Sequence, residues 1–115
     1  MPQITVDHSD RLVLDRAAFA AELHPLVAKT VETTVDACKT RFRRIEESFI
    51  GDGDPAQVML YLEVGILSGR TTEVKAELSD SILALLRSHA TAAPGDRLHL
   101  AVNVVDLDRE TYRKV

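Results

Sequence analysis

The sequence predicts an α+β fold, in which two β-α-β units form a four-stranded sheet with both helices on one face. Two observations favour this class. The apolar residues change twice along the chain from a two-residue period to a helical period and back. The two strand-to-strand spacings are also nearly equal, so the chain reads as two halves, residues 1–50 and 57–106. A right-handed crossover in each half makes its two strands parallel.

Composition limits the protein to one domain, residues 1–115, with a largely aliphatic core. Hydrophobic residues make up 45% and charged residues 28% of the chain, as in ordinary soluble domains. A net charge of −4 argues against nucleic acid or an anionic membrane as partner. We expect neither a secretory leader nor a membrane span. The single cysteine, Cys38, cannot form an internal disulfide, which favours a cytoplasmic protein.

The first half contains the least regular pattern. Alternation over residues 2–7 predicts a strand, and Asp15 is a suitable N-cap for a helix that begins at Arg16. Pro25 lies inside that helix and should kink or interrupt it. Residues 39–47 are strand-like but heavily charged, which predicts an edge strand.

The second half has clearer signals. The turn formers of residues 51–55 predict a linker. The third strand presents one wholly aliphatic face, formed by Val58, Leu60, Leu62, Val64 and Ile66. Thr71 or Thr72 then caps a helix whose buried stripe is Val74, Leu78, Ile82, Leu85, Leu86 and His89. The fourth strand repeats the aliphatic face with Leu98, Leu100, Val102 and Val104.

The sheet face away from the helices indicates an oligomer. It carries apolar or amphipathic side chains among polar ones, namely Met59, Tyr61, Leu67, His99 and Val105. Parallel-rich sheets are normally covered on both faces, and the chain has no further element to cover this one. We therefore predict a homo-oligomer, with an open-faced monomer as the alternative.

The first two residues raise a chemical possibility. A small residue in second place normally allows Met1 to be removed, which would leave Pro2 as a secondary amine at the head of a strand. Burial and nearby guanidinium groups would lower the pKa of that amine, so that it could act as a base near neutral pH. The alternative is an ordinary chain terminus with no chemical role.

Read together, four segments of the sequence resemble the 5-carboxymethyl-2-hydroxymuconate Δ-isomerases of the tautomerase superfamily. They are Met1-Pro2 with the following strand, Lys39-Thr40-Arg41, Leu67-Ser68-Gly69-Arg70 with the following Thr-x-Glu-Val-Lys, and Val104 to Arg109 with Tyr112-Arg113-Lys114. The resemblance implies a homotrimer of tautomerase-like subunits and a role in aromatic catabolism. The chain departs from the family at two places. It has Leu60-Tyr61 where relatives often carry Val-His, and Pro25 interrupts a helix that is usually unbroken.

The resemblance also implies roles for individual residues. Pro2 would be the general base that moves a proton in an unsaturated dicarboxylate, and Arg41 and Arg70 would bind the carboxylates. Tyr61 could donate a hydrogen bond to the substrate, although packing in the core or an interface is its other reading. Arg41 on a charged edge and Arg70 in a turn could equally have structural roles. Of the four histidines, His8 is nearest to Pro2 in sequence.

These residues favour a cofactor-independent isomerase or tautomerase that binds a small carboxylate substrate. No metal-ligand spacing and no glycine-rich phosphate motif occurs, so neither a metal nor a cofactor is expected. The alternative is a non-catalytic, ferredoxin-like module that binds a small ligand or a protein partner.

Overall fold

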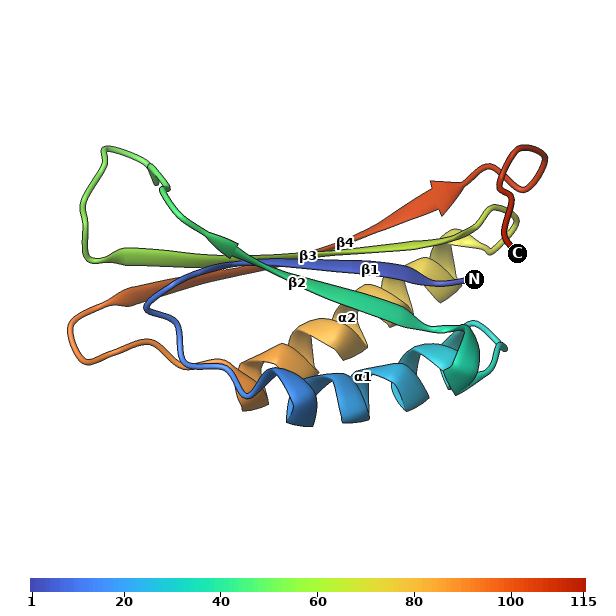
Figure 1. The fold of residues 1–115 in the computed structure, drawn as a ribbon, viewed down its shortest axis with the longest axis horizontal. Coiled ribbons are helices and arrows are strands. Elements are labelled where there is room, and N and C mark those ends of the chain that lie inside the picture. The colour runs from blue at the N-terminus through green and yellow to red at the C-terminus, as the bar shows by residue number, and fades with distance from the viewer.

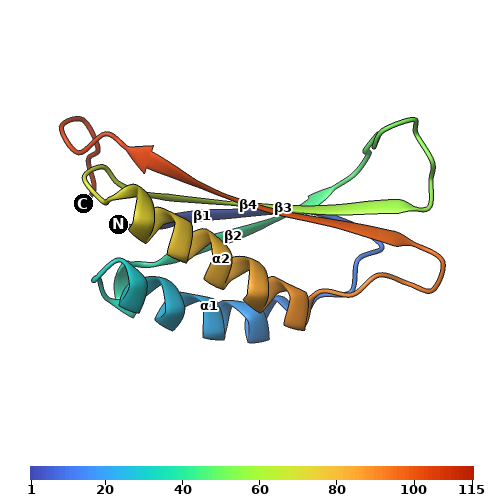
Figure 2. The same ribbon diagram turned by 180° about the vertical axis from the view of Figure 1, so that it is seen from behind.

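The computed structural model describes all 115 residues and confirms the predicted α+β class. The elements in chain order are β1 (Gln3–Ser9), α1 (Arg16–Thr30), the 3-10 turn η1 (Val35–Ala37), β2 (Lys39–Ile45), β3 (Gln57–Leu67), α2 (Thr72–His89) and β4 (Arg97–Leu107). The two helices lie together against one face of the sheet, and the opposite face carries no helix (Figures 1 and 2).

The sheet joins the two β-α-β units through their first strands. Its order is β2-β1-β3-β4, with β1 parallel to β2 and β3 parallel to β4. The central pair, β1 and β3, is antiparallel, with Gln3 opposite Gly65 and Val6 opposite Leu62. The start of β1 therefore lies beside the end of β3, which brings the N-terminus to the edge where β3 and β4 end.

The core lies between the sheet and the two helices, as the aliphatic alternation predicted. Fully buried side chains come from both central strands and both helices, among them Ile4, Val6, Leu60, Leu62, Val64, Phe19, Leu23, Val27, Leu78, Ile82 and Leu86. Burying a side chain of this kind contributes about 1.5–3 kcal/mol, so the core supplies most of the driving force for the fold. The predicted stripe of α2 is correct at Leu78, Ile82 and Leu86, which are buried, whereas Val74, Leu85 and His89 are only partly buried, and His89 is paired with Glu22.

Both helices begin at their predicted caps. The Asp15 side chain accepts a hydrogen bond from the Ala18 amide at 3.1 Å, and Thr71 Oγ1 accepts one from the Val74 amide at 3.2 Å. Each cap satisfies one of the amide groups that the first turn of a helix leaves without a partner. Thr71, rather than Thr72, is therefore the cap of α2.

Pro25 does not end the first helix, because α1 continues through this residue to Thr30, although one hydrogen bond of its ladder is lost as expected. Proline removes the amide that would bond to the carbonyl of Ala21. Ala21 and Pro25 are both exposed, so this carbonyl remains open to water. On the opposite side of the helix, Leu23 and Val27 are fully buried, and their packing holds the helix together across the missing bond. Neither helix has the length and apolar character needed to cross a membrane.

Candidate active site

The first strand fixes the backbone of Pro2 at one end of the sheet. The Lys39 amide donates a hydrogen bond to the Pro2 carbonyl at 3.2 Å, which extends the β1–β2 pairing by one residue. Pro2 is buried, and Met1 before it is partly exposed. Both chain termini lie at this end of the molecule (Figure 1).

The terminal amine lies in a cationic environment. The pKa of the Met1 amine is lowered from its ordinary value, first by burial and then by the positive charges of Arg70, Lys114, Arg109 and Lys39. None of these four side chains takes part in any of the chain's ion pairs. Their charge is therefore not neutralised within the chain, which favours a free amine and an anionic ligand at this site.

Arg70 links three elements at this edge. Its guanidinium group donates to the carbonyl of Leu67, at the end of β3, at 3.1 Å and to the carbonyl of Val31, at the end of α1, at 2.9 Å. The preceding Gly69 has φ 119°, a conformation that a side chain would strain, and this turn directs Arg70 back toward the sheet. The sequence motif is thus a compact turn that places a charge near the N-terminus.

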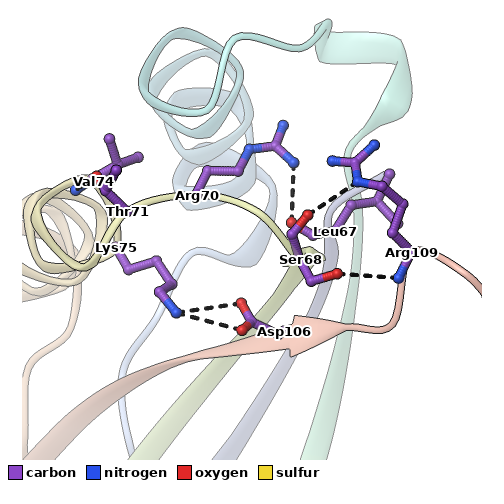
Figure 3. A network of polar contacts seen from close by, with 8 residues as sticks. All are labelled: Leu67, Ser68, Arg70, Thr71, Val74, Lys75, Asp106 and Arg109. Atoms are coloured by element: carbon purple, nitrogen blue, oxygen red, sulfur yellow. Dashed lines mark hydrogen bonds and ion pairs between the residues drawn. The ribbon is translucent and has the colours of Figure 1, made fainter.

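Arg109, just after β4, contacts the same turn, and it was not among the predicted site residues. Its amide donates to Ser68 Oγ at 3.2 Å and its Nε to the Ser68 carbonyl at 3.0 Å. Arg70 and Arg109 thus bind the consecutive carbonyls of Leu67 and Ser68, and Figure 3 shows their guanidinium groups on the same side of the turn. Below them, Lys75 is paired with Asp106 at 3.4 Å (Figure 3).

The last residues of the chain fold back against the first ones. Gln3 Nε2 donates to the Tyr112 hydroxyl at 2.9 Å, and Lys114 Nζ lies 3.3 Å from Met1 Sδ. A thioether is only a weak acceptor, so it leaves the lysine charge essentially uncompensated. Sequence analysis placed this segment only through the family resemblance, because it has no periodic pattern from which its position in the fold could be read.

The two other predicted binding residues, Arg41 and Tyr61, lie on the open face of the sheet. Arg41 donates to Gln3 Oε1 at 2.5 Å and to Thr5 Oγ1 at 3.3 Å, so it lies one residue from Pro2. It is exposed and is not among the charges that lower the pKa of the amine. The structure therefore places Arg70 near the terminal amine, whereas Arg41 contacts Gln3, the residue that follows Pro2.

Tyr61 lies further along the open face. Its hydroxyl donates to Glu63 at 3.2 Å, and it pairs with Asp7 in the sheet. Four strand positions separate it from Gly65, the partner of Gln3, which corresponds to about 13 Å. A single chain does not bring Tyr61 next to Pro2.

His8 occupies the far end of β1, about 20 Å from Pro2 at the ordinary rise of a strand. It is buried, its Nδ1 lies 3.1 Å from the Ser9 carbonyl, and its Nε2 lies 3.0 Å from the Arg16 guanidinium group. Arg16 also lies over the ring of Phe42. These contacts give His8 a role in packing between α1 and the sheet, remote from the terminal amine.

A separate pocket of about 320 Å³ opens at the end of the sheet opposite to the termini. Its lining includes the carboxylates Asp10, Glu46, Glu47 and Asp54, with Arg11 at its margin. Arg11 is paired with Asp96 at 3.1 Å. The excess of negative charge disfavours an anionic ligand there, so the cationic end of the sheet is the better candidate for a carboxylate site.

Comparison with known proteins identifies the fold. No protein-family model matches the sequence, and no curated protein matches it. The chain is similar in structure to a 5-carboxymethyl-2-hydroxymuconate isomerase from Deinococcus radiodurans R1, with a TM-score of 0.83 and 20% identity over 99% of this chain and 88% of that chain.

Two further similar structures come from proteins with other names. One is a fused 4-OT wild-type symmetric trimer, with a TM-score of 0.75 and 16% identity over 93% of this chain and 86% of that one. The other is FG41 malonate semialdehyde decarboxylase inhibited by 3-bromopropiolate, with a TM-score of 0.63 and 17% identity over 96% of this chain and 87% of that one. The chain has the fold of the tautomerase superfamily.

Proposed function

We propose that this protein is a cofactor-independent isomerase of the tautomerase type, in which Pro2 acts as general base after removal of Met1. The observation that carries the proposal is the position of Pro2, buried at the head of β1, next to an N-terminus surrounded by cations that have no carboxylate partner in the chain. These cations lower the pKa of the Met1 amine, and we expect them to act in the same direction on a Pro2 amine. A base poised near neutral pH is what proton transfer needs, and the surrounding cations suit an acidic substrate.

The proposed substrate is a small unsaturated keto or enol dicarboxylate; 5-carboxymethyl-2-hydroxymuconate is of this kind, with a third carboxylate on its carboxymethyl arm. The Pro2 nitrogen takes a proton from the enol or from a carbon next to the carbonyl group, and electrons shift along the conjugated chain. The Pro2 ammonium then returns the proton to another carbon, so atoms and charge balance without any co-reactant. Arg70 would stabilise the negative charge that develops on oxygen and bind one carboxylate.

The proposed assembly is a homotrimer in the cytoplasm, with each chain forming a single domain of residues 1–115. The open face of the sheet supports an assembly, because Met59, Tyr61 and Leu67 remain partly exposed there and no helix of the chain covers them. A similar structure is itself a symmetric trimer. Arg41 and Tyr61 would contact substrate only where subunits meet on this face.

Two substitutions at position 2 test the base. Pro2→Ala should still allow removal of Met1 and leave a primary amine, whereas Pro2→Leu should retain Met1 and convert the nitrogen into an amide. Loss of a general base costs about 10²–10⁴-fold in rate, so Pro2→Leu should lose that factor and Pro2→Ala should fall between it and the native chain.

The assay follows isomerisation of the dienol dicarboxylate by ultraviolet absorbance and of an aromatic enol acid in parallel. Pro94→Ala, in an exposed loop, is the matched control and should keep full activity. Equal activity of Pro2→Leu and the native chain on both substrates would overturn the proposal. A non-catalytic binding module would then be the better description.

A further inference from the structure

We propose that the C-terminal segment, residues 108–115, binds a second carboxylate of the substrate through Arg109 and Lys114. This binding would make the site selective for dicarboxylates. The inference deepens the proposed function and rests on it, since it concerns the same site. It assigns this part of recognition to residues outside the predicted set of Arg41, Arg70 and Tyr61.

The first step is the position of the segment. Three of its side chains contact the site: Arg109 at the Ser68 carbonyl (3.0 Å), Tyr112 at Gln3 (2.9 Å) and Lys114 at Met1 (3.3 Å). The first joins the segment to the Arg70 turn, and the other two join it to the start of the chain. The segment therefore forms a wall beside the terminal amine rather than a free tail.

The second step is the donor capacity that remains. Arg109 uses its Nε for the Ser68 carbonyl, and no hydrogen bond within the chain engages its two terminal nitrogens. One of these nitrogens would lie 3.9 Å from a Cβ added at Gly69, so this end of the guanidinium group lies close to the turn that carries Arg70. A guanidinium fork of this kind matches the two oxygens of a carboxylate.

The third step concerns Lys114. Its ammonium group contacts the Met1 side chain, which the proposed processing would remove. Removal would leave the ammonium group beside the new amine of Pro2 with one contact fewer. Arg109, which contacts the Arg70 turn, and Lys114, which contacts the start of the chain, are then both available to a second carboxylate while Arg70 binds the first.

Charge on the amine is consistent with this arrangement. Lys114 and Arg109 both lower the pKa of the Met1 amine, as Arg70 does, so the charges of the segment act at the N-terminus. Arg113, in the same segment, donates only to the carbonyls of Glu110 and Tyr112 and is not among these charges. It is therefore a matched control for loss of one positive charge from the segment.

The test measures binding of two non-isomerising probes by titration calorimetry. Trans,trans-muconate and sorbate share the same six-carbon diene, but muconate carries two carboxylates and sorbate one. We expect the native protein to prefer muconate, and Arg109→Gln and Lys114→Gln each to weaken muconate binding by about tenfold with sorbate binding little changed. Arg113→Gln should leave both affinities as they are, and Arg109→Lys should recover part of the loss.

The outcomes separate this inference from the proposed function. Equal losses for muconate and sorbate in Arg109→Gln and Lys114→Gln, or no loss in either, would overturn the inference. A loss of muconate preference in Arg41→Gln alone would also overturn it, and would return the second carboxylate to the edge strand. If instead the proposed function is wrong, the protein should show no isomerase activity but should still prefer muconate to sorbate. Thermal unfolding of each variant shows whether it is folded.

Discussion

Replacing Arg70 with glutamine should affect stability and the terminal amine at the same time, whereas replacing Arg109 should affect mainly the amine. Arg70 donates to the carbonyls of Leu67 and Val31 at 3.1 and 2.9 Å and is partly buried between α1 and the end of β3. A net contribution of about 1 kcal/mol for each such bond gives a loss of about 2 kcal/mol in Arg70→Gln.

The same reasoning gives a small loss for Arg109→Gln. Arg109 is exposed and its side chain makes one bond to a carbonyl, so the free energy of unfolding should fall by about 0.5 kcal/mol or less. The entropy of unfolding of a domain of this length is about 0.24 kcal/mol/K. The melting temperature should therefore fall by about 8 °C in Arg70→Gln and by about 2 °C or less in Arg109→Gln.

Both variants should raise the pKa of the terminal amine, because each removes a positive charge that disfavours the ammonium form. The assay combines thermal unfolding followed by circular dichroism with the pH dependence of amine alkylation. An equal loss of stability in the two variants would refute the structural role given to Arg70. An unchanged pKa in both would refute the electrostatic account of the site.

Three further predictions concern other parts of the chain. Burial lowers the pKa of His24, so the unfolded state binds more protons than the folded state. The free energy of unfolding should therefore decrease as pH falls below 6.5. A pH titration of stability should show this decrease in the native chain and not in His24→Gln. Burial raises the pKa of the Cys38 thiol, and we expect iodoacetamide to modify it more slowly in the folded than in the urea-unfolded chain; equal rates would contradict its placement. Tyr61→Asp places a charge on the open face and should shift the proposed trimer toward monomers in sedimentation velocity, with Thr111→Asp in the exposed tail as control; an unchanged sedimentation coefficient would argue against an interface there.

The sequence was sufficient to predict the layers of the fold. Alternation along β3 and β4 and the helical stripe around Leu78 each require one buried face, and only an arrangement with both helices on one side of the sheet satisfies them together. The caps at Asp15 and Thr71 were visible because a helix start has its own local chemistry. These features depend on residues close in sequence, which is why they could be read without the structure.

The site was predicted only in part, because its geometry depends on contacts between distant residues. The role of Arg70 was predicted from the resemblance of its turn to a family motif, but the position of Arg109 depends on a bond to Ser68, 41 residues away in the chain. Lys114 reaches Met1 only because β3 and β4 end at the edge of the sheet where β1 begins. Pro25 was misjudged for the opposite reason, since a local rule was outweighed by tertiary packing of the buried side of α1.

The central claim is that Pro2 carries a free amine of lowered pKa. It is tested most directly by treating the purified protein at neutral pH with a limiting amount of 3-bromopropiolate, an electrophile with a carboxylate, and then measuring the intact mass and mapping the modified peptide. The account predicts one adduct, on a chain that lacks Met1, located at the nitrogen of Pro2. A chain that retains Met1, or label spread over the lysines with Pro2 unmodified, would contradict the proline base and with it the proposed reaction.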